Sequence, residues 1–294
     1  MKSIIFGANG QDGFYLSELL KLKQIEVVAV SRSTGKDNIT GNVTDQSFVE
    51  SIIKDHQPDF VFNLAANSTT QHSALLENHE TIATGTIHVL EAVYKYSPLS
   101  KVFLSGSALQ FENRSNPIKE TDPFCAKDAY SAARIYTTYL ARYYRTLNVK
   151  VYVGYFFNHD SPLRDARHLN KKIIDYVKAL SQNKQKEKLS IGNVNVQKEF
   201  NHAKDIANAI FILVSQNEIF EAVIGNGLGY TIKDWLSICF QFINKTPDDF
   251  IVINKDYVSP YEKLICNPET LKSLGWKHTI SIEQLAKEMY DYEG

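Results

Sequence analysis

The start of the chain carries an apolar segment followed by three glycines, and this pattern strongly restricts the fold. Residues 3–6 read as a strand that runs into Gly7, Gly10 and Gly13, after which a helical pattern covers residues 15–22. The first glycine of such a turn permits a tight bend, the second lets backbone N–H groups approach a pyrophosphate, and the third lets the helix pack on the strand. We therefore predict a dinucleotide-binding turn, with an ordinary glycine turn as the alternative.

The second apolar strand, residues 26–30, is followed by Arg32 and Ser33. An NAD-binding chain usually has a carboxylate at this point, which binds the adenine ribose. Residues 31–33 contain none, and a guanidinium with a hydroxyl can instead bind a 2′-phosphate. We therefore predict NADP as the cofactor; the alternative is that Arg32 is a solvated loop charge.

The predicted cofactor site draws on the glycine turn and on the ends of the next strands. Asn42 and Val43 are expected to frame the adenine. The full predicted set is Gly7, Asn9, Gly10, Gln11, Asp12, Gly13, Arg32, Ser33, Asn42, Val43, Leu64, Ala65 and Ala66.

Composition limits the remaining possibilities. The chain has 294 residues, of which 44% are hydrophobic, and a net charge of −1, so it can bury a large core as one elaborated domain or two lobes. There is no basic excess for nucleic acid, no signal-type leader before the first strand and no apolar run long enough for a bilayer. We expect a cytoplasmic protein without nucleic-acid or membrane partners. Cys125, Cys239 and Cys266 are too scattered for a metal site, so we predict free thiols and no metal.

Strand and helix patterns alternate through the first half of the chain. Strands are predicted at residues 3–6, 26–30, 60–64, 101–104 and 149–155, and helices at 15–22, 46–54, 82–94 and 130–146. This alternation predicts an α/β protein with a doubly wound parallel Rossmann sheet and a smaller C-terminal α/β substrate-binding lobe. We divide the chain into a Rossmann domain, 1–157 with 201–225 returning to it, and a lobe made of 158–200 and 226–294.

A second chemical signal is the segment from Tyr130 to Arg134. Residues four apart on a helix share one face, so these two side chains can reach the same cleft. The pair resembles the Tyr-x-x-x-Lys of the short-chain dehydrogenase/reductase superfamily, with arginine in place of lysine. The resemblance implies that Tyr130 is the general acid/base and that both residues contact the nicotinamide ribose. Because arginine does not release a proton at ordinary pH, no proton relay is expected through position 134.

Five motifs, in order along nearly the whole chain, narrow the resemblance. They are Gly10-Gln11-Asp12-Gly13-x-Tyr15-Leu16, Asn63-Leu64-Ala65-Ala66, Phe157-Asn158-His159-x-Ser161-Pro162-x-Arg164, Asn201-His202-Ala203-Lys204-Asp205, and Asn267-Pro268 with Leu274-Gly275-Trp276-Lys277. They resemble the GDP-mannose 4,6-dehydratases and the related GDP-4-keto-6-deoxymannose reductases. The resemblance implies a nucleotide-sugar substrate bound by Asn158, Arg164, Lys171 and Lys198, since basic side chains suit an anion. Each of these basic residues taken alone is more often a solvated charge.

The segment after the fourth strand departs from the dehydratases. Their Ser-Thr-Ser-Glu-Leu-Tyr-Gly is replaced by Ser-Gly-Ser-Ala-Leu-Gln-Phe at residues 105–111. The glutamate that serves dehydration in that family falls on Ala108, which is neither an acid nor a base. The threonine falls on Gly106, and the superfamily's structural asparagine falls on Ile82. Catalysis is therefore assigned to Tyr130 and Arg134, with Ser107 or Ser105 as the polarising hydroxyl.

Three functions remain open. The first is an NADP-dependent nucleotide-sugar oxidoreductase, most simply one that reduces a 4-keto-6-deoxy, preferably GDP-linked sugar for surface-polysaccharide biosynthesis, with an epimerase as a variant. The second is a 4,6-dehydratase, and the third is a catalytically silent paralogue that binds cofactor or nucleotide sugar.

The resemblance also implies an assembly. Two helices carry outward apolar and aromatic residues that in this branch pack as a four-helix dimer interface, namely Val89, Tyr94, Tyr136, Tyr139 and Tyr143. We expect a homodimer or a dimer of dimers. The alternative is that these residues belong to the core.

Overall fold

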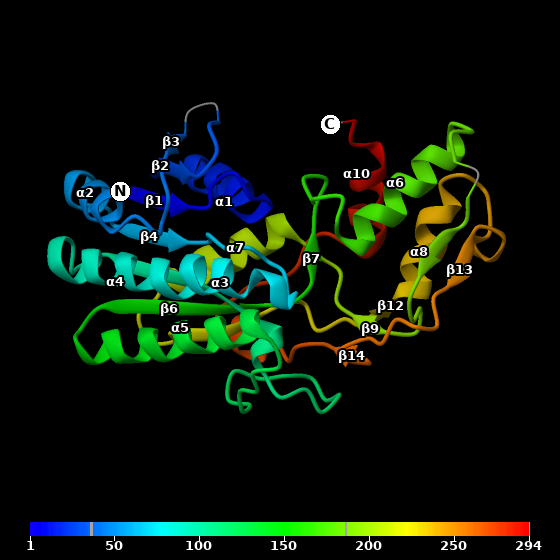
Figure 1. Ribbon diagram of the computed structural model, residues 1–294. Coiled ribbons are helices and arrows are strands. Elements are labelled where there is room, and N and C mark those ends of the chain that lie inside the picture. Colours follow the sequence, from blue (N-terminus) through cyan, green and yellow to red (C-terminus); the bar gives the residue numbers. More distant parts are fainter. Residues whose placement is uncertain (36–37, 186, 294) are drawn as a thin grey trace.

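Seven parallel strands form one sheet in the larger part of the molecule (Figure 1). The computed structural model describes residues 1–35, 38–185 and 187–293. In the order β11-β6-β5-β4-β1-β2-β3, the strands are β11 (Glu221–Ile224), β6 (Lys150–Phe156), β5 (Lys101–Ser107), β4 (Phe60–Asn63), β1 (Lys2–Phe6), β2 (Glu26–Ser31) and β3 (Ile39–Thr40). The chain winds outward in both directions from β1 and β4, and ligands bind doubly wound sheets at this switch point. The predicted fold class is confirmed.

Helices cover both faces of this sheet. One layer contains α2 (Gln46–His56), α4 (Gly85–Tyr96) and α5 (Ala129–Thr146), and the other contains α1 (Gln11–Leu22) and α7 (Ala203–Val214). Along β1, Ile4 and Phe6 pack into the first layer and Ile5 into the second. Strands buried on both faces are apolar throughout, which is why the sequence revealed them. Across the described residues, no helix is both long and apolar enough to cross a membrane.

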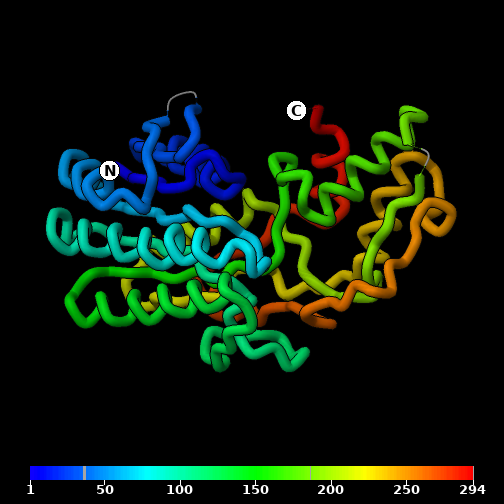
Figure 2. The backbone as a smooth tube through the Cα atoms, viewed as in Figure 1, coloured from blue at the N-terminus to red at the C-terminus, as the bar shows by residue number. Residues whose placement is uncertain are grey.

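The smaller lobe has its own apolar core, seen at the right of Figure 1. Trp235 and Phe240 lie at the centre of this core and are fully buried. The helices of the lobe are α6 (Leu169–Ser181), α8 (Ile232–Gln241) and α10 (Ile282–Asp291). The chain as a whole also has two short helices, α3 (Leu75–Asn78) and α9 (Glu269–Ser273). Short strands outside the seven-stranded sheet are β7 (His159–Asp160), β8 (Leu189–Ile191), β9 (Gln197–Lys198), β10 (Asn201–His202), β12 (Tyr230–Thr231), β13 (Ile251–Ile253) and β14 (Lys263–Leu264). Figure 2 shows the chain entering the lobe after β6, returning through α7 and β11, and then entering the lobe again.

The helix predicted at 82–94 differs most from the structure. Helical turns begin with a 3₁₀ turn at His72–Ala74 and continue through α3 and a π-helical segment, His79–Thr84, into α4. Leu75 and Leu76 are exposed, so the first turns lack the buried stripe by which a sequence reveals a helix. The short strands of the lobe have two or three residues each and were likewise invisible to periodicity.

Four tyrosines form an exposed patch on α4 and α5. Tyr94, Tyr136, Tyr139 and Tyr143 are 43% to 57% exposed. The assignment of Val89 to this surface was wrong, because Val89 is fully buried in the core under α4. It lies on the face of α4 that packs against the sheet. We call the four tyrosines the tyrosine patch.

Candidate active site

The glycine turn opens a groove at the carboxyl end of β1. Gly7 has a φ of +86°, and a Cβ on Gly13 would lie 2.4 Å from the carbonyl oxygen of Gly7, so both positions require glycine. Helix α1 starts after Gly10 with no side-chain cap, whereas side chains cap the N-termini of α2, α5, α8 and α10. The first-turn N–H groups of α1 are therefore open to an anion, as a dinucleotide pyrophosphate requires.

One end of the groove is a cleft of about 280 Å³ beyond β2. Asn9, Arg32, Ser33, Asn42 and Val43 all line it, as expected from the sequence. The Asn9 amide donates to the Ser33 hydroxyl at 3.0 Å. None of the described residues that line this cleft carries a carboxylate. The arrangement leaves cationic and hydroxyl groups where a ribose phosphate would lie.

Arg32 has a neighbour that the sequence did not suggest. Its Nη1 lies 3.4 Å from the Glu77 carboxylate, and both side chains are about half exposed. Such an exposed ion pair is weak and exchanges readily with another anion. Glu77 thus holds Arg32 at the cleft, and a phosphate group can compete with Glu77 for the Arg32 guanidinium.

The other end of the groove is a cleft of about 270 Å³ that shares Gly7, Gly10, Leu64 and Ala66 with the first. Five residues predicted or discussed for catalysis line it together, which are Ser105, Ser107, Ala108, Tyr130 and Arg134. The two clefts therefore form one continuous groove, in which a cofactor can reach from the adenine end to Tyr130.

Arg134 is buried beside Tyr130. Its guanidinium carbon lies 5.2 Å from the centre of the Tyr130 ring, and its Nη1 donates to both the carbonyl and the hydroxyl oxygen of Ser105. Its Nε is buried with no hydrogen-bond partner among the described residues. A buried unpaired donor in a cleft is the mark of a ligand oxygen, and a nicotinamide ribose would supply one. The residues present fit a nicotinamide dinucleotide.

The two candidate serines differ in their contacts. The Ser105 hydroxyl donates to the Asn63 carbonyl at 3.3 Å and accepts from Arg134, so it is engaged within the protein. The Ser107 hydroxyl accepts from the Leu109 N–H at 3.2 Å, which leaves its hydrogen free to be donated to a substrate oxygen. The geometry favours Ser107 as the polarising hydroxyl.

Position 106 has no room for the threonine of the dehydratases. A Cβ on Gly106 would lie 2.6 Å from the Tyr155 ring, and Gly106 is not among the residues lining the cleft. Ile82, in the place of the superfamily's asparagine, is buried against Tyr130 and Ala133. Gly106 and Ile82 are therefore closely packed behind the cleft, whereas Ala108 and Arg134 line it.

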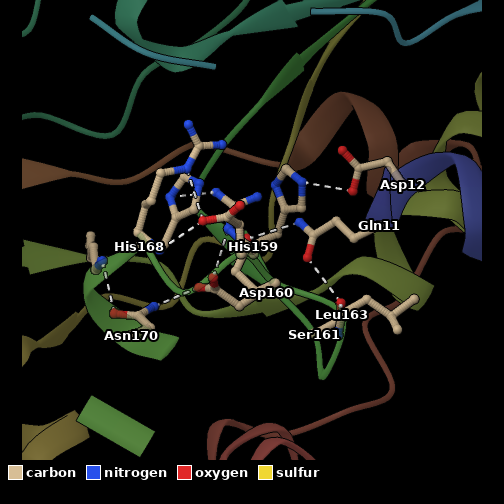
Figure 3. Close-up of polar contacts among 12 residues, drawn as sticks. Gln11, Asp12, His159, Asp160, Ser161, Leu163, His168 and Asn170 are labelled. Atoms are coloured by element: carbon tan, nitrogen blue, oxygen red, sulfur yellow. Dashed lines mark hydrogen bonds and ion pairs between the residues drawn. The ribbon is translucent and has the colours of Figure 1, made fainter. Parts of the chain in front are cut away.

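Gln11 and Asp12 lie in the glycine turn, but their side chains contact the segment after β6 (Figure 3). Asp12 pairs with Nε2 of His159 at 3.0 Å, and the side-chain oxygen of Gln11, Oε1, accepts from the Ser161 hydroxyl at 2.9 Å. Both residues line the cleft, so their binding of the cofactor stays a prediction; within the protein, their side chains join the phosphate-binding turn to the loop after β6. A motif shows that residues recur together, but not which partner each side chain reaches.

Asp12 and His159 each favour the charged form of the other. Burial by itself would raise the pKa of the Asp12 carboxyl, but His159 holds that pKa below its usual value. Burial by itself would lower the pKa of His159, but Asp12 raises it above the usual value. When the ring is protonated, both nitrogens donate, Nε2 to Asp12 and Nδ1 to the Phe157 carbonyl at 2.7 Å. Asp12 is the one carboxylate among the described residues that line this cleft, and it is paired with His159.

Two of the four predicted substrate-binding residues line the cleft. Asn158 and Arg164 line the cleft, and the side-chain oxygen of Asn158 is buried without a partner among the described residues. Lys198 is buried behind them and donates to Asn170 at 3.1 Å. Lys171 is ion-paired with Asp175 along α6 and does not line the cleft, so its assignment is not supported by position. The sequence does not show whether a lysine on α6 faces the cleft or points away from it, because tertiary packing decides the orientation.

Sequence reasoning missed three residues here. Asp160 and His168 flank Arg164, and Tyr261 lines the cleft from the C-terminal lobe. Burial raises the pKa of Tyr261 to about 12. Nothing in the sequence pointed to these three residues, because Arg164 lies outside any helix and a spacing of four on either side of it does not imply contact.

Comparison with known proteins fits this geometry. The family model for GDP-mannose 4,6 dehydratase matches residues 4–289. The chain belongs to the GDP-mannose 4,6-dehydratase family. GDP-mannose 4,6 dehydratase 2 of Arabidopsis thaliana is 28% identical to this family member over 98% of the chain and 86% of the relative. The resemblance drawn from the motifs is confirmed.

Solved structures share the fold of this dehydratase-family chain. A UDP-glucose 4-epimerase of Thermotoga maritima superposes with a TM-score of 0.88 at 20% identity, covering 99% of this chain and 98% of that one. RMD from Pseudomonas aeruginosa, complexed with NADPH, superposes with a TM-score of 0.85 at 16% identity, covering 98% and 96%. At these identities the likeness shows the fold alone.

Proposed function

We propose that this chain is an NADP-dependent nucleotide-sugar oxidoreductase that reduces a 4-keto group. The observation that carries the proposal is the cleft itself: Tyr130 and Ser107 line it together, while Ala108 stands where a dehydratase has its glutamate. Hydride transfer to a ketone requires one proton donor and a hydrogen bond to the developing alkoxide, and it needs no carboxylate.

The residues divide the reduction between them. When bound, the nicotinamide supplies the hydride to the carbonyl carbon. The Tyr130 phenol donates its proton to the carbonyl oxygen, and the Ser107 hydroxyl holds that oxygen by a hydrogen bond. The Arg134 guanidinium lies beside the Tyr130 ring, 5.2 Å from its centre, and a proton from solvent restores the phenol. The ketone thus gains one hydride and one proton and becomes an alcohol.

Dehydration fits this cleft poorly. Loss of the 6-hydroxyl needs an acid and a base near the sugar's exocyclic carbon, and the Ala108 methyl group is neither. The nearest carboxylate along the chain, Glu112, is paired with Arg114 at 2.7 Å and does not line the cleft. An epimerase, which also needs hydride transfer at C4, remains a variant of the proposed chemistry.

Arg164 and Asn158 support a nucleotide-sugar substrate. Both line the cleft that contains Tyr130 and neither lines the adenine end, and Arg164 offers a guanidinium to a diphosphate. GDP is the favoured nucleotide because the family model and the curated relative carry GDP-mannose in their names.

A turnover assay tests the proposal. The protein is incubated with NADPH and GDP-4-keto-6-deoxymannose, and the dTDP-linked keto sugar serves as a second candidate. Formation of the alcohol with NADPH consumption supports the reductase. Water loss from GDP-mannose would instead show a dehydratase, interconversion at C4 without net NADPH use an epimerase, and binding without turnover a silent paralogue.

Cofactor choice gives the first prediction. If Arg32 binds a 2′-phosphate, the protein binds NADPH more tightly than NADH, and Arg32→Ala removes most of that preference. Loss of a charged hydrogen bond costs about 1.5–3 kcal/mol, which corresponds to roughly tenfold to a hundredfold in affinity. Fluorescence titration with both cofactors measures the ratio, and Lys23→Ala, outside the groove, is the control. Equal binding of both cofactors by the unmodified protein would rule the idea out.

Assembly gives the second prediction. The tyrosine patch exposes four aromatic rings on adjacent helices, and a second copy of the chain can cover it by the same patch. We propose a homodimer, or a dimer of dimers, built on this patch. Light scattering at micromolar concentration is expected to give at least twice the monomer mass, and a strictly monomeric protein would contradict the proposal.

Three further assignments stay predictions. They are the division into 1–157 with 201–225 and 158–200 with 226–294, the cytoplasmic location, and a role in surface-polysaccharide synthesis.

A further inference from the structure

The guanidinium of Arg164 is contacted from both directions along the chain, by Asp160 and by His168. Both partners are labelled in Figure 3. Asp160, four residues earlier, places a carboxylate oxygen 3.2 Å from Nε. His168, four residues later, places Nδ1 3.1 Å from Nη2. The side chain of Arg164 lines the cleft, and its Nη1 makes no hydrogen bond within the described part of the chain. Asp160 and His168 therefore leave the Nη1 edge of the Arg164 guanidinium available to a ligand.

Asp160 alone is a loose anchor. Nε lies near its carboxylate but has no hydrogen bond of good geometry there. The same carboxylate accepts from Asn170 at 2.6 Å and faces the buried Lys198 ammonium, so its charge is shared between two cations. The hydrogen bond to His168 is therefore the directional contact that sets the rotation of the guanidinium plane.

His168 acts here as a neutral acceptor. Burial, followed by the nearby Arg164 charge, lowers its pKa to about 4, so the ring is neutral near pH 7. Because the Arg164 guanidinium can only donate, Nδ1 is the acceptor of this hydrogen bond. Its side chain does not cap helix α6, which begins at the next residue. The Arg164 contact is thus the one hydrogen bond of its ring among the described residues.

We propose that His168 is a positioning residue for phosphate recognition, which orients Arg164 so that its remaining donors meet the diphosphate of the substrate. The inference rests on the proposed nucleotide-sugar function. A guanidinium binds phosphate through a planar fork, so fixing its plane before binding reduces the entropy lost on binding. Arg164 and Lys198 share the Asp160 carboxylate, while Asp12, which also interacts with Arg164, is paired with His159; this set of positive groups suits an anion.

A pair of variants of equal shape separates the hydrogen bond from packing. Asparagine places its side-chain oxygen where histidine has Nδ1, whereas leucine places a methyl group there. His168→Leu is expected to weaken binding of GDP roughly tenfold, the cost of a lost hydrogen bond to a charged group. His168→Asn is expected to stay within about threefold of the unmodified protein, since it keeps the acceptor. Titration calorimetry with GDP and with UDP measures both.

A double-mutant cycle tests whether His168 acts through Arg164. In an Arg164→Ala background, His168→Leu is expected to cause no further loss of GDP affinity, because the group it orients is absent. NADPH affinity is expected to be equal in all variants. If His168→Leu lowers the melting temperature strongly, His168→Phe, which keeps the ring, replaces it.

The outcomes are distinct. An equal loss of GDP affinity for the leucine and asparagine variants, or an undiminished effect of His168→Leu without Arg164, would overturn the positioning role and leave the proposed function standing. Parallel losses of NADPH and GDP affinity would show a general structural role and overturn it too. Failure of the unmodified protein to bind either nucleotide would overturn the nucleotide-sugar function and this inference with it.

Discussion

Tyr130→Phe is expected to reduce turnover on a 4-keto nucleotide sugar by about a hundredfold or more, the usual scale for loss of a general acid/base. The phenol is the proton donor that lines the cleft beside Arg134 and Ser107. Its ring packs on Ile82 and Ala133, and phenylalanine keeps those contacts. The fold and the affinities for NADPH and nucleotide sugar are therefore expected to survive, so that the loss falls on kcat.

The measurement is the rate of NADPH oxidation at saturating substrate, together with cofactor titration of both proteins. Tyr136→Phe is the matched control, because Tyr136 is on the same helix but 43% exposed on the tyrosine patch. Its turnover is expected to equal that of the unmodified protein. A Tyr130→Phe protein with normal turnover would show that another group donates the proton, and Tyr261, which also lines the cleft, would be the next to test.

Glu221→Gln is expected to lower the free energy of unfolding by about 3 kcal/mol, as breaking a buried ion pair does. Glu221 is the first residue of β11, and its side chain is 14% exposed. Its carboxylate accepts from Arg142 at 2.8 Å, from Arg145 at 2.7 Å and from the Tyr155 hydroxyl at 2.6 Å. Glutamine leaves two guanidinium groups without their counter-charge at the junction of α5 with the edge strand.

The same residue predicts how stability depends on pH. Burial alone would raise the pKa of Glu221, but the hydrogen bonds from Arg142, Tyr155 and Arg145 lower it from 4.5 to about 2. A carboxyl whose pKa is lower in the folded state stabilises the fold above its unfolded pKa. That contribution is lost as the pH falls from about 4.5 towards 2.

Thermal unfolding at a series of pH values checks both statements. The unmodified protein is expected to lose melting temperature through this acid range, and Glu221→Gln to start lower and to lose less. Glu18→Gln is the control, because Glu18 pairs with Lys21 on the exposed side of α1 and is expected to change neither property. Equal melting curves for Glu221→Gln and the unmodified protein would mean that the two arginines find other partners.

The glycine turn shows what local pattern can predict. A positive φ at Gly7 and a close approach at Gly13 allow essentially no other residue, so the three glycines specified strand, turn and helix before any tertiary contact was known. The fully apolar strands and the placing of Tyr130 with Arg134 on one helix face followed from periodicity in the same way.

The direction in which a side chain points was harder to predict from the sequence. Lys171 pairs with Asp175, and Val89 is buried in the core. The side chains of Asp12 and Gln11 contact the loop after β6. The sequence suggested other partners for each of these residues. The contact between His168 and Arg164 was also invisible, because neither residue is in a helix where a spacing of four fixes contact.

The sequence by itself determined the doubly wound fold, the phosphate-binding turn and the family, because these depend on local backbone requirements and on apolar periods. Tertiary structure decided that Ser107 rather than Ser105 has a free hydroxyl hydrogen, that Gly106 has no room for a side chain, and which charges pair. Those outcomes depend on atoms brought together from distant parts of the chain, whose distances no local pattern encodes.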